Sequence, residues 1–196
     1  MNKLKVLVAA ALLGLPLAAC EEGTSPPPVG EIEGQVVIEG QGMDGVSVNL
    51  SSGDATTTSN GGYYQFSDVE GGTYTVTISG YPADASFDAT SAEVTISTSG
   101  QTVTRNFSGS YIRTASLMGM VTVEGVGLPG ITVDLSGRDA AQTTTDANGQ
   151  YTFTGLRAGN YTVEITGFDP TDVAFSDNSG AVTIAVGESK VRSFDG

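Results

Sequence analysis

The chain carries two copies of one sequence pattern, and this repeat constrains its fold more than any other feature. Gly34 matches Gly119 at an offset of 85 residues, and Val94 matches Val182 at an offset of 88. The drift in offset falls between matched segments, as expected of insertions in loops. Other matched pairs are Gly45 and Gly130, Leu50 and Leu135, Tyr64 and Tyr151, Phe66 and Phe153, Tyr74 and Tyr161, and Phe107 and Phe194. A repeat of this length predicts two tandem domains.

Apolar and polar residues alternate strictly within each copy. Val46, Val48 and Leu50 are separated by polar residues, and the same alternation begins at Ile131 in the second copy. Such period-two patterning is typical of strands with one buried face. Turns rich in Gly, Asn and Asp separate the strands, and no helical pattern follows residue 20. The sequence predicts an all-β protein of two tandem Ig-like or prealbumin-like antiparallel β-sandwich domains, over 31–110 and 117–196, with a linker at 111–116.

The second copy contains the segment Asp146-Ala147-Asn148-Gly149. Asn-Gly between two strands predicts a tight hairpin turn. The same letters resemble the start of a calcium loop, but no Glu stands at the spacing that an EF-hand loop requires. The first copy has Ser59 where the second has Asp146. We interpret the segment as a turn and keep a calcium site at Asp146 and Asn148 as the alternative; no other metal and no cofactor is expected.

The residue types available exclude most catalytic centres. The 196-residue chain has no His and a single Cys, at position 20. It therefore has no Ser-His-Asp or Cys-His nucleophile and no ordinary His/Cys zinc site, and no disulfide can form within one chain. We expect a protein that is not an enzyme.

The charge balance excludes polyanionic partners. From Cys20 onward the chain has 6 basic and 22 acidic residues, a formal charge of 6 − 22 = −16. Such a surface repels phosphate backbones, so nucleic-acid binding is not expected.

The N-terminus has the layout of a secretion signal. Lys3 and Lys5 precede an apolar run that is too short to span a bilayer, and residues 17–20 read Leu-Ala-Ala-Cys. This ending resembles the bacterial lipobox, which implies that residues 1–19 are removed and that Cys20 is acylated, so the membrane is a partner through the lipid. Residues 20–30 contain three consecutive prolines and predict an extended tether. Glu21 rather than Asp after the Cys favours an outer-membrane location.

Two long loops offer the candidate ligand-binding residues. Asp84 and Phe87 share the spacing Asp-x-x-Phe with Asp172 and Phe175 of the second copy. Loops of this length often carry function, although an aromatic plug with solvated acids explains the pattern equally well. The other aromatic residues that match between the two copies lie at inward positions of central strands, which favours a role in the core.

The combined pattern is similar to a known group of modules. Each copy runs from a Gly and an apolar strand through Gly-Val/Ile-x-Val-x-Leu, and then through Asn-Gly-x-Tyr-x-Phe or its variant to Gly-x-Tyr-x-Val. This order resembles the carboxypeptidase regulatory-like (transthyretin-like) modules and the B-type domains of SD-repeat adhesins, over residues 31–109 and 117–195. The resemblance implies a spacer or adhesive unit on the cell envelope. The alternative is a carbohydrate-binding module of the starch-binding-like fold. The ligand stays open, because fold does not specify function.

Overall fold

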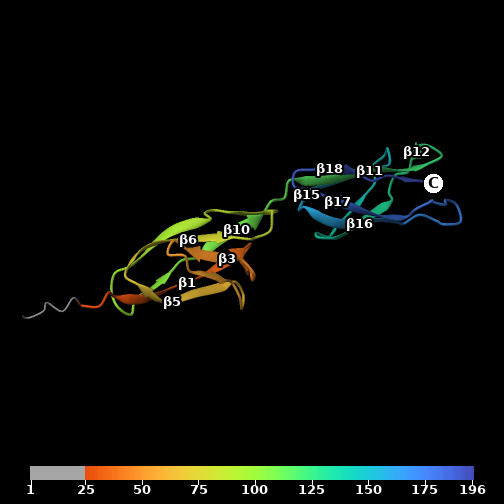
Figure 1. Cartoon of the computed structure of the whole chain (residues 1–196). Helices are drawn as coiled ribbons and strands as arrows, with labels where there is room; N and C mark the ends of the chain where they lie inside the picture. Colours follow the sequence, from red (N-terminus) through yellow and green to blue (C-terminus); the bar gives the residue numbers. More distant parts are fainter. Residues whose placement is uncertain (1–24) are drawn as a thin grey trace, which may run out of the picture.

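A computed structural model describes residues 25–196. These residues form nineteen β-strands and no helix, and accordingly none of them lies in a helix that could cross a membrane. The strands make two sandwiches that lie end to end, with the start of β1 and the C-terminus at opposite ends (Figure 1). The predicted signal peptide 1–19 and Cys20 lie outside the described residues. The all-β prediction is confirmed.

The first module spans residues 29–111. One sheet has the order β2-β1-β10-β7, with β5 and β9 also paired to β1, and the other has the order β4-β3-β6-β8. Its strands are β1 (Val29–Ile38), β2 (Gln41–Gly42), β3 (Ser47–Leu50), β4 (Ala55–Thr57), β5 (Tyr63–Glu70), β6 (Gly72–Ser79), β7 (Ala85–Phe87), β8 (Ser91–Ile96), β9 (Thr102–Thr104) and β10 (Phe107–Tyr111).

The second module spans residues 115–196 and repeats this topology, except that among the described residues no strand takes the place of β7. One sheet has the order β12-β11-β15, with β18 and β19 also paired to β11, and the other has the order β14-β13-β16-β17. Its strands are β11 (Ala115–Val123), β12 (Val126–Gly127), β13 (Thr132–Gly137), β14 (Ala141–Thr144), β15 (Gln150–Leu156), β16 (Gly159–Thr166), β17 (Ser179–Ile184), β18 (Ser189–Val191) and β19 (Phe194–Asp195).

Each module has its own hydrophobic core. Val46, Val48 and Leu50 are buried as their alternation predicts, and so are Tyr64 and Phe66 of β5. The Tyr64 and Phe66 rings meet edge to face with centroids 6.1 Å apart. The equivalent pair in the second module has the same geometry. The strand aromatics therefore stabilise the cores.

The first strand of each module pairs in parallel with the last strands of the same module. β1 pairs in this way with β9 and β10, a feature that alternation cannot predict because it reports only which face is buried. At Gly34 the two segments are so close that a Cβ atom would overlap the carbonyl of Arg105. The Tyr64 hydroxyl donates to that same carbonyl at 2.5 Å. Gly119 has the equivalent surroundings in the second module.

A buried threonine closes the loop before the β5 hairpin. The Thr58 hydroxyl accepts from the Val46 N–H at 2.9 Å and donates to the Met43 carbonyl at 2.6 Å. Thr145 makes the same two hydrogen bonds in the second module. A buried backbone group without a hydrogen-bond partner would cost about 1–3 kcal/mol. The hydroxyl stabilises the fold by giving partners to one backbone N–H and one backbone carbonyl.

Candidate functional site

The junction between the modules is the site where charged residues converge. β10 ends at Tyr111 and β11 begins at Ala115, so only three residues lie outside strands. The connection is shorter than the predicted linker 111–116, because the flanking strands extend into it. The Ile112 N–H donates to the Asp84 carbonyl at 2.7 Å. This bond ties the connection to the β6–β7 loop of the first module.

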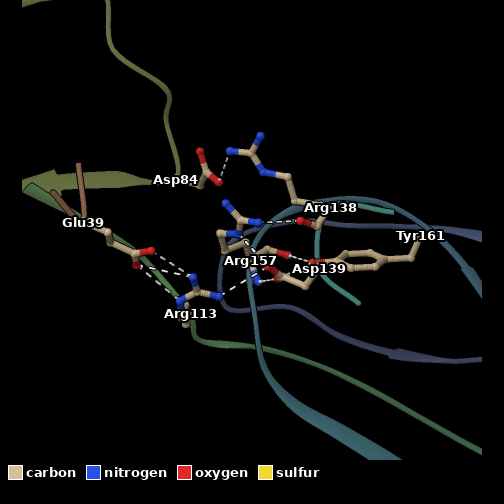
Figure 2. Close-up of polar contacts among 7 residues, drawn as sticks. All are labelled: Glu39, Asp84, Arg113, Arg138, Asp139, Arg157 and Tyr161. Atoms are coloured by element: carbon tan, nitrogen blue, oxygen red, sulfur yellow. Dashed lines mark hydrogen bonds and ion pairs between the residues drawn. The ribbon is translucent and has the colours of Figure 1, made fainter. Parts of the chain in front are cut away.

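Arg113 bridges the two modules from the connection itself. Its guanidinium lies 3.1 Å from a carboxylate oxygen of Glu39 and 3.3 Å from one of Asp139 (Figure 2). The hydrogen bond from Arg113 holds the pKa of Glu39 below its usual value. The Arg113 and Glu39 side chains are 43% and 40% exposed, so this pair contributes little free energy. Arg113 nevertheless contacts one carboxylate of each module.

A second contact crosses the junction with its carboxylate shielded from water. Arg138 of the second module lies 3.0 Å from the Asp84 carboxylate, whose side chain is only 8% exposed. The Tyr111 ring lies beneath two guanidinium groups, with the Arg138 and Arg157 carbons 5.2 Å and 4.6 Å from the ring centroid. Cation–π contacts of this kind contribute about 0.5–2 kcal/mol each. The last side chain of β10 is therefore held by the second module.

Asp139 organises the second module's side of the junction. Its carboxylate accepts from the Arg157 Nε at 2.7 Å, from the Arg157 backbone N–H at 2.9 Å and from the Tyr161 hydroxyl at 2.8 Å. Burial acts to raise the pKa of Asp139, but the hydrogen bonds from Arg157 and Tyr161 outweigh it and leave that pKa lowered. Burial and the bond to Asp139 raise the pKa of Tyr161 to about 12. Asp139 is thus ionised and Tyr161 protonated at neutral pH.

Sequence reasoning missed this cluster, although the sequence contained a signal for it. Three of the six basic residues after Cys20 meet here, in a chain that is otherwise strongly acidic. They are Arg113, Arg138 and Arg157. Their counterparts in the first copy are Pro28, Gly53 and Glu70. Basic residues that break the repeat could have marked one end of the second module as a contact surface.

The predicted loop residues do not form one site. Asp84 is buried in the junction rather than solvated. Phe87 packs on Tyr81, with ring centroids 4.7 Å apart, and against the first core. Phe175 packs in the same way on Phe168, at 4.8 Å, while Asp172 is exposed. The aromatic-plug interpretation fits both Phe residues, and Asp84 and Asp172 play different parts.

The calcium candidates lie in the hairpin turn. Oδ1 of Asp146 accepts from the backbone N–H groups of Asn148 and Gln150, both at 2.8 Å. The carboxylate thus has a structural use without a metal. Among residues 25–196, no group of three or more potential ligands gathers there or elsewhere. The calcium site stays a prediction.

The first module builds the same turn with a carboxylate from a different place. Asp44, in the preceding loop, accepts from the N–H groups of Gly61 and Gly62 at 2.9 and 2.6 Å. Because this acid comes from another position, the motif comparison that paired Ser59 with Asp146 could not find it. Each turn is therefore held by a carboxylate of its own, from Asp44 in the first module and from Asp146 in the second.

Comparison with known proteins finds matches for each of the two modules. Residues 118–191 match the protein-family model of the SdrD B-like domain, and residues 31–109 match that of the second β-sandwich domain of NOMO1-like subunits of the BOS complex. Two solved structures share the fold. The Bacillus anthracis TIE protein has a TM-score of 0.64 at 19% identity, over 86% of this chain and 34% of that one. The pilus adhesin SpaC from Lactobacillus rhamnosus GG has a TM-score of 0.52 at 15% identity, over 81% and 26%.

Relatives in sequence include staphylococcal serine-aspartate repeat-containing proteins. Serine-aspartate repeat-containing protein F of Staphylococcus epidermidis is 33% identical over 162 residues, covering 67% of this chain and 9% of the relative. Serine-aspartate repeat-containing protein D of Staphylococcus aureus strain Newman is 30% identical over 182 residues, covering 74% and 14%. This chain spans about a tenth of their length. The chain is similar to SD-repeat proteins, with residues 118–191 matching the SdrD B-like domain, and over its described part it consists of tandem Ig-like β-sandwich modules, as the resemblance implied.

Proposed function

We propose that the chain is a non-enzymatic, lipid-anchored protein of the bacterial envelope whose two modules form a stiff spacer with a binding role. The observation that carries the proposal is the junction. Two sandwiches follow each other with three residues between them, and ion pairs bridge the gap (Figure 2). Cation–π contacts to the Tyr111 ring bridge it as well. Short connections and interlocked ends restrict the relative rotation that flexible linkers allow. The homology to modules of surface proteins supports the same role.

The anchor is proposed at Cys20. Acyl chains contribute about 0.8 kcal/mol for each buried CH₂, and lasting attachment needs more than one chain. Lipid at one end and a stiff pair of modules beyond the prolines would hold the second module away from the bilayer. Glu21 after the Cys favours the outer membrane, where the cell has one.

Replacement of the anchor residue tests the attachment. The precursor is produced with a C-terminal epitope in a bacterium that has an outer membrane, and membrane and soluble fractions are compared. We expect the unaltered protein in the membrane fraction and Cys20→Ser in the soluble fraction, because the variant has no thiol to acylate. Thr24→Ser, four residues further on, is the control and should stay with the membrane. Retention of Cys20→Ser in the membrane would contradict the anchor.

The loops do not support the carbohydrate-binding alternative. Phe87 and Phe175 are half-buried and pack against the cores of their own modules, so both rings have a structural use without a sugar. A separate feature of the first module does favour a sugar site.

A further inference from the structure

The outer face of the first module carries a groove with an unusual set of side chains. It has a volume of about 610 Å³, within the range of ligand sites. Three adjacent strands, β9, β1 and β5, form its floor. Gln35 lies opposite Tyr63, and Glu33 lies between Gln65 and Thr104. The edge strand β4 and the turn after it form one wall through Thr56, Thr57, Ser59 and Asn60.

An exposed aromatic ring stands at this groove. Tyr63 is 58% exposed, and it is the only aromatic residue of the described range 25–196 among the exposed large hydrophobic residues. Leaving a ring in water forgoes the free energy that its burial would contribute. An exposed ring at the edge of a concave polar surface is suited to stacking on the C–H face of a sugar.

Two amide side chains in the groove are each held at one end only. Oδ1 of Asn106 accepts from the Gln35 backbone N–H at 2.8 Å, and Nε2 of Gln35 donates to the Gly61 carbonyl at 2.7 Å. These partners assign both amides without ambiguity. The Asn106 NH₂ remains as a donor and the Gln35 carbonyl as an acceptor. A rigid sheet thus presents a preoriented donor and acceptor together with the Glu33 carboxylate.

The fold does not require these side chains, because the second module builds the same face without them. The counterparts of Glu33, Gln35, Tyr63, Thr104 and Asn106 are Met118, Met120, Gln150, Val191 and Ser193. Met118, Met120 and Val191 are 40%, 38% and 69% exposed. The polar set with its single ring is therefore a property of the first module alone and is free to serve binding.

We infer that this groove binds a neutral oligosaccharide, with Tyr63 stacking on one ring and Gln35, Asn106 and Glu33 contacting its hydroxyls. A sugar hydroxyl donates and accepts at once, which matches the free donor and the free acceptors. The formal charge of −16 from Cys20 onward disfavours anionic sugars. The site goes beyond the spacer role and does not depend on the anchor.

The test uses the full chain with the substitution Cys20→Ser, which removes the proposed site of acylation. Maltohexaose, cellohexaose and the hexaose of N-acetylglucosamine are titrated by calorimetry and by NMR of the side-chain amides. At least one is expected to bind saturably at millimolar concentration or below and to shift the Gln35 and Asn106 amide signals. Tyr63→Gln should weaken that binding about tenfold or more, because stacking on the ring is lost. The variant should fold, since Gln150 occupies the equivalent position.

The matched control places a tyrosine on the other module. Gln150→Tyr should leave the affinity unchanged, because its neighbours there are methionines. The proposal is overturned if none of the three oligosaccharides binds saturably. It is also overturned if binding persists at full affinity in Tyr63→Gln combined with Asn106→Ser. Because binding is measured in the absence of lipid, these outcomes are independent of whether the anchor proposal holds.

Discussion

Gly119→Ala is expected to unfold the second module while the first stays folded. A Cβ atom at this position overlaps the backbone carbonyl of Arg192 and lies 2.7 Å from the Tyr151 hydroxyl oxygen. Arg192 lies between β18 and β19, which both pair with β11, and its own N–H donates to the Met118 carbonyl. Its carbonyl therefore cannot move aside as a flexible side chain can. We expect a loss of about 3 kcal/mol or more of unfolding free energy, at the upper end for overpacked sites. That is a large part of the stability of a small domain.

Calorimetry of the soluble Cys20→Ser chain measures this effect. Gly119→Ala should shift or abolish only the unfolding transition of the second module. Gly34→Ala should affect only the transition of the first module. The control is Gly72→Ala, where an added Cβ meets only the Tyr74 ring at 3.4 Å and the effect should be small. Loss of both transitions in Gly119→Ala would show instead that the modules unfold as one unit.

Asp139→Ala is expected to loosen the junction. The change removes the carboxylate that Arg157, Tyr161 and Arg113 share. Tyr161 and Arg157 would keep only the backbone carbonyls of Arg157 and Arg138 as acceptors. Hydrogen bonds to charged groups contribute about 1.5–3 kcal/mol each, and the partly buried Arg157 guanidinium would be left without its carboxylate. The second module should lose about 2–3 kcal/mol of stability, and the angle between the modules should become variable.

Spin labels on the two modules report that angle. Cysteines replacing the exposed Ser108 and Thr154 are labelled in the Cys20→Ser chain, and the distance distribution is measured by pulsed electron resonance. The distribution should be narrow in the parent and clearly broader in Asp139→Ala. The control is Asp134→Ala, at a site away from the junction. It removes a carboxylate that accepts a hydrogen bond from Gln142 at 2.6 Å, and the distance distribution should stay narrow. An equally narrow distribution in Asp139→Ala would refute the stiffening role of the cluster.

Acid should have the same effect as Asp139→Ala on the parent. The folded-state pKa of Asp139 is lowered from its usual 3.8, so the folded protein favours the ionised form. The stabilisation is therefore fully present above about pH 4 and is lost as the pH falls through the lowered pKa. The parent's distance distribution should broaden only in that acidic range. Between pH 5 and 8 it should not change, and broadening there would contradict the assignment.

Much of the fold could be predicted because it depends on local sequence patterns, and both copies of the repeat contain the same patterns. Alternation around Val48 and Val133 reports a buried face whatever the partner strand is. The parallel pairing of β1 with β9 and β10 could not be predicted in this way, since pairing partners lie far apart in sequence. The Asp44 contact with the β5 turn was missed for the same reason: the acid and the amides are 17 and 18 residues apart.

The groove escaped prediction because its residues are individually ordinary. Gln35, Tyr63 and Asn106 read as exposed strand positions in the sequence. Only the register of three strands brings them to one surface, and only the hydrogen bonds of the two amides define which ends are free. Such preorganisation belongs to tertiary structure.

The sequence by itself determined that the chain forms two β-sandwich modules, which residues enter their cores and that the chain is strongly acidic. It could not determine the environment of Asp84 and Asp172, which share the motif Asp-x-x-Phe and the same place in their modules. Asp84 is buried beside Arg138, 54 residues further along the chain, whereas Asp172 is exposed. The physical reason is that alternation sets the local burial of a strand, while the neighbours of a loop depend on which module packs against it.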